Sequence, residues 1–156
     1  MNMPRTSGPR YLAVIGYVHS ALGISNDVLQ ESVKPIIERM FQTASGCTAV
    51  LMGASEEEAY PFANALYEVL GLNLYYPFEA FNHTMPVTSQ MATLITDVAT
   101  VSTGEQVVIV VIHPNLAVKL TQMFCHRALH EEVSCPDIHP GQGVLIDCET
   151  SEIKPL

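Results

Sequence analysis

The segment QVVIVVIH, residues 106–113, constrains the fold more than any other part of the sequence. Its interior is entirely apolar and β-branched, which is typical of a strand that is buried on both faces. Such strands occur in parallel sheets that helices cover on both sides. Pro114 follows at once, and proline is favoured in the first turn of a helix. The sequence therefore predicts a central strand that ends at His113 and leads directly into a helix.

Short β-branched runs alternate along the whole chain with longer segments of helical periodicity. This alternation, with strands that are apolar on both faces, is typical of a parallel sheet between two layers of helices. The sequence therefore predicts an α/β fold, a three-layer α/β/α sandwich with a mainly parallel central sheet. Further strands are expected at 11–18, 47–54, 72–76 and 143–149, and helices at 26–45, 55–70, 86–102 and 114–129.

Length and charge limit the class of protein. The 156 residues are expected to form one domain, over 10–156, behind a flexible N-terminal arm at 1–9. Seven basic against sixteen acidic side chains give a net charge of −9, which argues against a nucleic-acid partner. The chain has no apolar run that could span a bilayer and no signal-peptide core, so we expect a soluble, cytoplasmic protein without a membrane partner.

The carboxyl ends of the predicted strands are the expected place for a site. Ligands of parallel sheets bind there, because the amide groups of the following helices point outward at this edge. The edge would carry residues 15–17 and 53–55 together with Glu79 and His113. Asn115 lies in the first turn of the helix after His113 and is a further candidate for binding.

Four segments occur in the order of a known family. YLAVIGYV (11–18) looks like its first strand, and GASEEEAYPFANALYEVLGL (53–72) matches its second motif with the Leu-Gly-Leu ending. VVIVVIHPNLAVKLTQMF (107–124) looks like its third motif, and GQGVLIDCETSEIKPL (141–156) like its closing strand and tail. The chain thus resembles, over nearly its whole length, the short form of the histidine phosphatase superfamily. The resemblance implies a phosphoglycerate mutase-like fold.

The residues that carry the family's chemistry mostly differ here. Family members have Arg-His-Gly at the end of the first strand, with the histidine as nucleophile, and this triplet does not occur in the chain. By the resemblance, Ile15 stands at the arginine, Gly16 at the nucleophile and Tyr17 at the glycine. Glu58 stands at the position of a second arginine. His113 is the single residue of the phosphate pocket that has a counterpart.

These departures imply a degenerate active site. The family mechanism needs an attacking imidazole and cationic donors for the phosphoryl dianion. An anion about 4 Å from a carboxylate such as Glu58 would be repelled by roughly 4 kcal/mol at an effective dielectric constant near 20. We therefore expect a pseudoenzyme that binds an unknown small molecule or protein, without ordinary phosphomonoesterase activity, and we leave a homodimer open. Its ligand site would contain Gly16, Tyr17, Ser55, Glu58, His113 and Asn115.

An enzymatic alternative also stays open. A diverged phosphatase or phosphotransferase-like hydrolase would use His113, with His19 and Glu79 as further catalytic groups, on a small phosphorylated or other substrate. This requires the three side chains to converge on one point. Two of the candidates also have structural explanations. His113 can cap the helix that starts at Pro114, and Glu58 has the spacing of a capping box with Ser55.

A third alternative is a metal-regulated binding module. His126 and His130 are four residues apart, as are Cys135 and His139, and zinc accepts these atom types. Neither pair forms a Cys-x-x-Cys knuckle, so no metal ligand is assigned. The glycines 141 and 143 lead into a strand rather than a helix, which is not the pattern of a phosphate-binding loop, and no cofactor is expected.

Overall fold

The computed structural model describes residues 8–19, 23–55, 57–72, 74–79 and 86–156. Six strands form one sheet in the order β3-β2-β4-β1-β5-β6. Strands β1 to β4 are parallel, whereas β5 is antiparallel to both of its neighbours. The elements are β1 (Tyr11–Gly16), α1 (Asn26–Thr43), β2 (Thr48–Ala54), α2 (Tyr60–Leu70), β3 (Tyr75–Phe78), α3 (Val87–Val101), β4 (Gln106–Ile112), α4 (Pro114–Ala128), β5 (Gly143–Asp147) and β6 (Ile153–Pro155).

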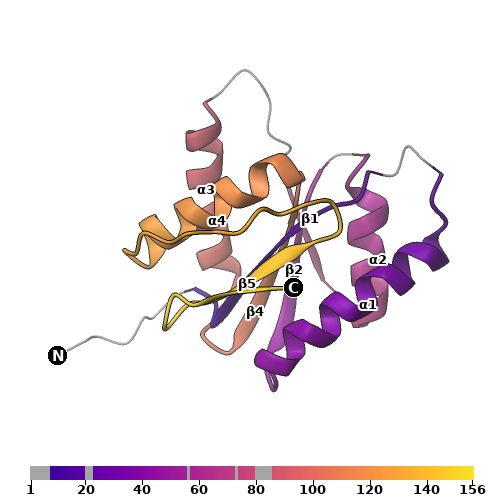
Figure 1. Cartoon of the computed structure of the whole chain (residues 1–156), viewed down its shortest axis with the longest axis horizontal. Coiled ribbons are helices and arrows are strands. Elements are labelled where there is room, and N and C mark those ends of the chain that lie inside the picture. Colours follow the sequence, from indigo (N-terminus) through magenta and orange to yellow (C-terminus); the bar gives the residue numbers. More distant parts are fainter. Residues whose placement is uncertain (1–7, 20–22, 56, 73, 80–85) are drawn as a thin grey trace.

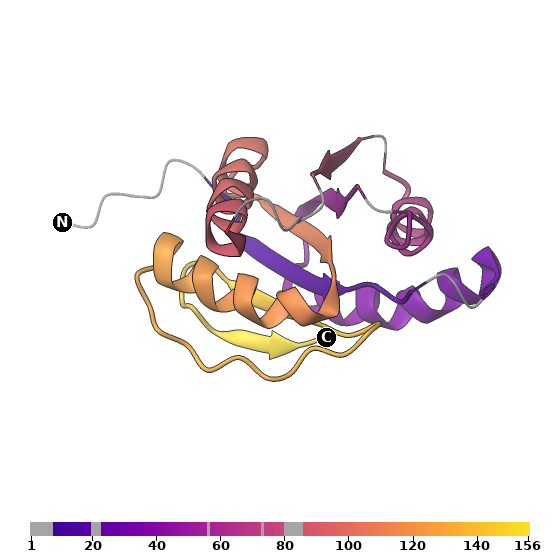
Figure 2. The ribbon, with the colours of Figure 1, turned by 90° about the horizontal axis from the view of Figure 1, so that it is seen from above.

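The helices lie in two layers, one on each face of the sheet. Helices α1 and α2 cover one face and α3 and α4 the other, as both views of the ribbon show (Figures 1 and 2). Right-handed connections explain this division, because the chain moves one way across the sheet from β1 to β3 and the other way afterwards. The predicted three-layer α/β/α sandwich with a mainly parallel sheet is confirmed. No helix of the described residues is long and apolar enough to cross a membrane.

Strands β1 and β4 form the centre of the core. All six residues of β1 are buried, as are those of β4 after Gln106. The two strands pair in register from Tyr11 opposite Val107 to Gly16 opposite Ile112. The next residues, Tyr17 and His113, therefore emerge side by side at the carboxyl edge. The helices that follow these two strands lie on opposite faces, so the strands diverge into a crevice at this point.

Helix α2 begins later than the Ser-x-x-Glu spacing predicts. The expected capping box at Ser55 and Glu58 is wrong, since the helix starts at Tyr60 and its N-cap, Ala59, makes no side-chain cap. Pro61 explains the shift, because a proline without an N–H group is best accommodated in the first turn. Glu58 thus lies in the turn before the helix and is available for another contact.

The outer strands are short, and the last one was not predicted. Strand β3 has four residues, over 75–78 instead of the expected 72–76, and β6 has three. Each contains a proline, Pro77 and Pro155. Proline lacks the N–H group that an inner strand needs, so it is confined to the edges of sheets.

The beginning of the described chain is fixed to the last residue of β5. Residues 1–7 of the predicted arm lie outside the described residues, and Gly8 and Pro9 are buried. The Arg10 guanidinium bonds to the Asp147 carboxylate, and these side chains are 24% and 18% exposed. Burial by itself raises the pKa of Asp147, but hydrogen bonds from Arg10 and from two backbone N–H groups outweigh it, so that its pKa is lowered.

Replacing Arg10 is expected to reduce stability in a pH-dependent way. Arg10→Met should lower the free energy of unfolding by about 1 kcal/mol near neutral pH, because a mostly buried carboxylate loses its cation. Since the folded-state pKa of Asp147 is lowered, this contribution is present above the unfolded pKa near 4 and disappears as the pH falls through the folded value. Urea unfolding at neutral and at acid pH measures the loss of unfolding free energy and its dependence on pH. Lys34→Met, which removes an exposed pair with Glu31, is the control with little expected effect at either pH. An Arg10→Met effect that persists in acid would contradict the role of the pair.

Candidate functional site

A pocket of about 180 Å³ lies at the carboxyl ends of β1 and β4, where the two chains diverge. This is the position at which open α/β sheets bind ligands. We call it the rim pocket. Its lining residues come from the end of β1, the start of α4 and the segment between α4 and β5, and are Tyr17, His19, His113, Pro114, Asn115, Ile138, His139 and Pro140.

The Tyr17 ring forms the inner wall of the rim pocket against His113. The ring centroids are 5.6 Å apart and the planes are nearly perpendicular, an edge-to-face pair that aromatic rings favour. Tyr17 is 1% exposed, so its side chain is part of the core as well as of the pocket. Gly16 has no side chain to offer, and a Cβ there would lie 3.1 Å from Pro114 Cα. The glycine therefore allows the first turn of α4 to pack against β1.

His113 is the N-cap of α4, as the structural explanation of this residue predicts. Its Nδ1 accepts a hydrogen bond of 3.1 Å from the backbone N–H of Asn115. A nitrogen that accepts carries no proton, so the neutral ring carries its proton on Nε2. Protonating Nδ1 would break the cap and add positive charge at the positive end of the helix dipole. His113 is thus arranged to donate from Nε2 rather than to attack with it.

Glu58 and His19 lie paired next to the rim pocket. His19 Nε2 lies 3.1 Å from Glu58 Oε1, and both side chains are about half exposed. The pair connects the chain after β1 to the turn before α2. Its exposure to solvent limits the strength of the attraction. Its geometric effect is to hold a carboxylate close to the mouth of the pocket.

The segment between α4 and β5, residues 129–142, closes one side of the rim pocket. Gly141 N donates to Gly16 O at 2.8 Å and Gly16 N donates to Gln142 O at 2.9 Å, so the end of the segment is fixed to the end of β1. Ile138 is buried, and His139 joins the lining. Sequence reasoning missed this wall, because it considered His139 only as part of a metal site. Gly141, at φ 79°, was the available signal for a sharp turn before the last long strand.

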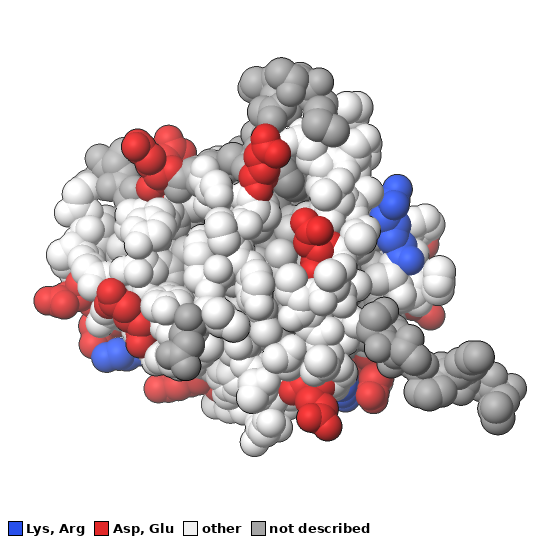
Figure 3. Space-filling model, turned by 180° about the vertical axis from the view of Figure 1, so that it is seen from behind, with Lys and Arg blue, Asp and Glu red and all other residues white. Residues whose placement is uncertain are grey.

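The described lining of the rim pocket contains three imidazoles but no lysine or arginine. On the face seen in Figure 3, acidic side chains are likewise widely spread and basic ones are few. Neutral groups, such as imidazole N–H groups and the side-chain amide of Asn115, are therefore among the polar donors that the described part of the pocket can offer to a ligand.

Four of the predicted site residues line the rim pocket, namely Tyr17, His19, His113 and Asn115. Gly16 directly precedes Tyr17 and packs against Pro114 of the lining, and Glu58 is connected to the pocket through His19. Ser55 and Glu79 are exposed and do not belong to its described lining. Glu79 follows β3, which β2 separates from β4, so it leaves the sheet farther along the edge than His113 does.

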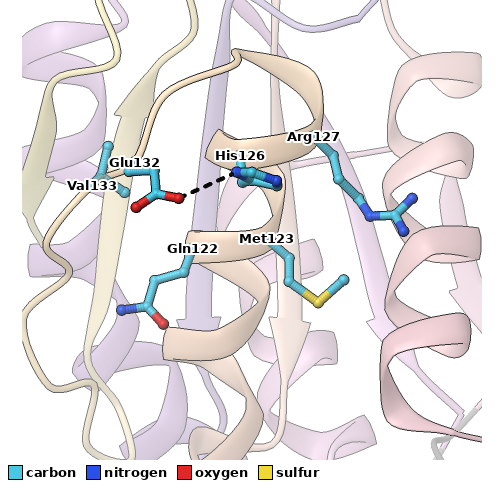
Figure 4. A pocket seen from close by; sticks show the side chains of 6 residues that line it. All are labelled: Gln122, Met123, His126, Arg127, Glu132 and Val133. Carbon is cyan, nitrogen blue, oxygen red and sulfur yellow. Dashed lines mark ion pairs between the residues drawn. The ribbon is translucent and has the colours of Figure 1, made fainter.

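The four residues of the metal alternative are distributed between different environments. His139 lines the rim pocket, whereas His126 lines a separate hollow of about 390 Å³ at the end of α4. In that hollow His126 Nδ1 faces Glu132 Oε1 at 3.8 Å, and Arg127 points away from both (Figure 4). Over the described ranges, no group of three or more His, Cys, Asp or Glu side chains is placed to hold a metal ion.

Two of the cysteines, Cys125 and Cys135, have raised pKa values. Burial raises the pKa of Cys125 to about 11, and burial also raises the pKa of Cys135. Zinc binds the thiolate, so a raised pKa opposes ligation near neutral pH. The Cys135 thiol instead donates to the carbonyl oxygen of Pro136 at 3.3 Å. All four cysteines are free thiols.

Comparison with known proteins gives the fold. No protein-family model and no curated protein matches the chain. Among solved structures, the chain is similar to a phosphoglycerate mutase from Plasmodium falciparum, with a TM-score of 0.53 and 13% sequence identity over 97% of this chain and 90% of that chain. At this identity the similarity is evidence for the fold alone. The chain has a phosphoglycerate mutase-like α/β fold, as the order of its motifs predicted.

Proposed function

We propose that the chain is a histidine-phosphatase-like domain that binds a ligand in the rim pocket and does not hydrolyse phosphomonoesters. The ligand would be a small molecule, or a segment of a protein, that presents a hydrogen-bond acceptor to the imidazole donors. The observation that carries the proposal is the cap that His113 makes on α4. A histidine whose Nδ1 is used by Asn115 N can donate from Nε2 but has no lone pair there for phosphorus.

The neighbours of His113 support the same proposal. The side chain next to it at the carboxyl edge is the phenol of Tyr17, which is no nucleophile of the imidazole type. A phosphoryl dianion also needs cationic donors, and the described lining of the rim pocket contains no lysine or arginine side chain. The carboxylate of Glu58 beside His19 would repel such an anion further.

Turnover assays test the proposal directly. The purified chain, incubated with p-nitrophenyl phosphate and with a panel of sugar, nucleotide and protein-histidine phosphates, is expected to release phosphate no faster than buffer. His113→Ala and its matched control, His126→Ala in the separate hollow, should give this same background. Turnover that His113→Ala abolishes and His126→Ala retains would overturn the proposal.

The pair of Glu58 and His19 favours a second candidate function, a hydrolase whose substrate is not a phosphate ester. A carboxylate that accepts from one nitrogen of an imidazole makes the other nitrogen a better base. His19 lines the rim pocket, so this base could activate water on a neutral ester or amide substrate. Screening such substrates with Glu58→Gln as the variant separates the candidates. Turnover that falls by about tenfold to a hundredfold in Glu58→Gln would favour the hydrolase.

A further inference from the structure

A second pocket, of about 260 Å³, lies between α2 and the start of β3. We call it the tyrosine pocket, because Tyr60, Tyr67 and Tyr75 line it together with Asn64. Tyr60, Asn64 and Tyr67 belong to α2 and follow one another at intervals of four and three residues, so they share one face of this helix. Three of the six tyrosines of the chain thus surround one small space, and no charged side chain belongs to the described lining.

The position of Tyr75 depends on Gly53 in the neighbouring strand. A Cβ on Gly53 would lie 2.9 Å from Tyr75 Cζ and still closer to the hydroxyl oxygen. The phenol therefore occupies the space that the side chain of any other residue at position 53 would take. Burial raises the pKa of Tyr75, and the nearby Tyr60 raises it further, so the hydroxyl stays uncharged. The result is a neutral aromatic wall that rests on β2.

The Asn64 amide is held in one orientation by a residue outside the pocket. Its Nδ2 donates to Glu68 Oε1 at 3.0 Å, and Glu68 Oε2 accepts from Asn26 Nδ2 of α1 at 3.3 Å. A carboxylate can only accept, so the NH₂ group of Asn64 must face Glu68. Among the described residues this is the one side-chain bond of Asn64, which leaves its second N–H and its carbonyl oxygen for a ligand. The pocket thus combines aromatic faces with an adjacent donor and acceptor.

We propose that the tyrosine pocket binds a neutral, planar nitrogen heterocycle of nucleobase size, as found in nucleosides. Bases stack on aromatic side chains, and an asparagine amide pairs with a donor and an acceptor on the edge of a base. The volume lies just below the range of pockets for drug-sized ligands, which suits a single base rather than a larger molecule. The uncharged lining matches a neutral ring. This inference is independent of the function proposed for the rim pocket.

Equilibrium dialysis of the full chain against adenosine and against uridine, up to millimolar concentration, tests the proposal. Saturable binding of at least one nucleoside is expected. Tyr60→Ala should weaken it about tenfold or more, because a stacking face is lost. Tyr60 is 59% exposed, so this change leaves the core intact. Asn64→Leu, which keeps the volume of the side chain and removes the amide, should weaken binding to a similar extent.

Two controls make the result specific to this pocket. Tyr76→Ala removes the next tyrosine of β3, which lies outside the tyrosine pocket, and His113→Ala alters the rim pocket. Both should bind the nucleoside as the unchanged chain does. The proposal would be overturned by the absence of saturable binding, by equal affinity in Tyr60→Ala and Asn64→Leu, or by loss of binding in His113→Ala. Saturable binding of methyl glucoside without binding of nucleosides would likewise overturn it and assign the pocket to a neutral sugar.

Discussion

Tyr17→Ala is expected to lower the free energy of unfolding by about 3 to 5 kcal/mol, the range for removing a buried aromatic ring. Tyr17 is 1% exposed and its ring packs edge-to-face on His113. Truncation would leave a cavity at the junction of β1 and α4, and the surrounding strands are too tightly paired to fill it. The same change would remove the inner wall of the rim pocket.

Urea unfolding followed by circular dichroism measures this effect. Tyr17→Phe is the matched variant, because it retains the ring and removes the hydroxyl group. Tyr17→Phe should lower the free energy of unfolding clearly less than Tyr17→Ala does, by about 1 kcal/mol for a single hydrogen-bonding group. Equal losses in the two variants would show that the hydroxyl group, and not the packing of the ring, stabilises this corner of the fold.

Gly143→Ala is expected to destabilise the chain by about 1 to 3 kcal/mol, the usual effect of overfilling a packed site. A Cβ at this position would lie 2.7 Å from the carbonyl oxygen of Val14 and 2.9 Å from Ile15 Cγ1. The first of these neighbours belongs to the backbone of β1, which is paired on both sides and cannot move away. The added methyl group would therefore force β5 away from β1.

A second glycine of the chain supplies the comparison for this variant. A Cβ at Gly104, in the turn before β4, would meet no atom within 4 Å, and its backbone angles suit other residues. Gly104→Ala should therefore change the unfolding free energy by less than about 0.5 kcal/mol. Thermal or urea denaturation of both variants decides the question. Similar stabilities for Gly143→Ala and Gly104→Ala would refute the close approach of β5 to β1.

The sequence predicted those elements whose signals are local. The apolar run before His113 and the proline after it define the junction of β4 and α4, and α3 begins and ends within one residue of the prediction. The start of α2 was wrong because two local signals competed, and Pro61 prevailed over the spacing of Ser55 and Glu58. Strand β6 was missed, since three residues carry too little periodicity to be recognised.

The candidate site was predictable only in its inner part. Tyr17 and His113 follow directly from paired strands, so their proximity is a consequence of the topology. The wall formed by Ile138 and His139 could not be predicted, because its place depends on hydrogen bonds of Gly141 and Gln142 to a residue more than a hundred positions away. The partnership of His19 with Glu58 likewise joins two irregular segments that have no pattern in common.

The prolines of the two outermost strands have a consequence for the behaviour of the chain in concentrated solution. Exposed sheet edges invite strands of other molecules to attach, which is a route to aggregation. Pro77 and Pro155 interrupt the row of N–H donors at the two opposite borders, and both borders are only three or four residues long. Intermolecular extension of the sheet is thereby disfavoured from both directions, so a protein with a strongly apolar interior can remain dispersed as it accumulates.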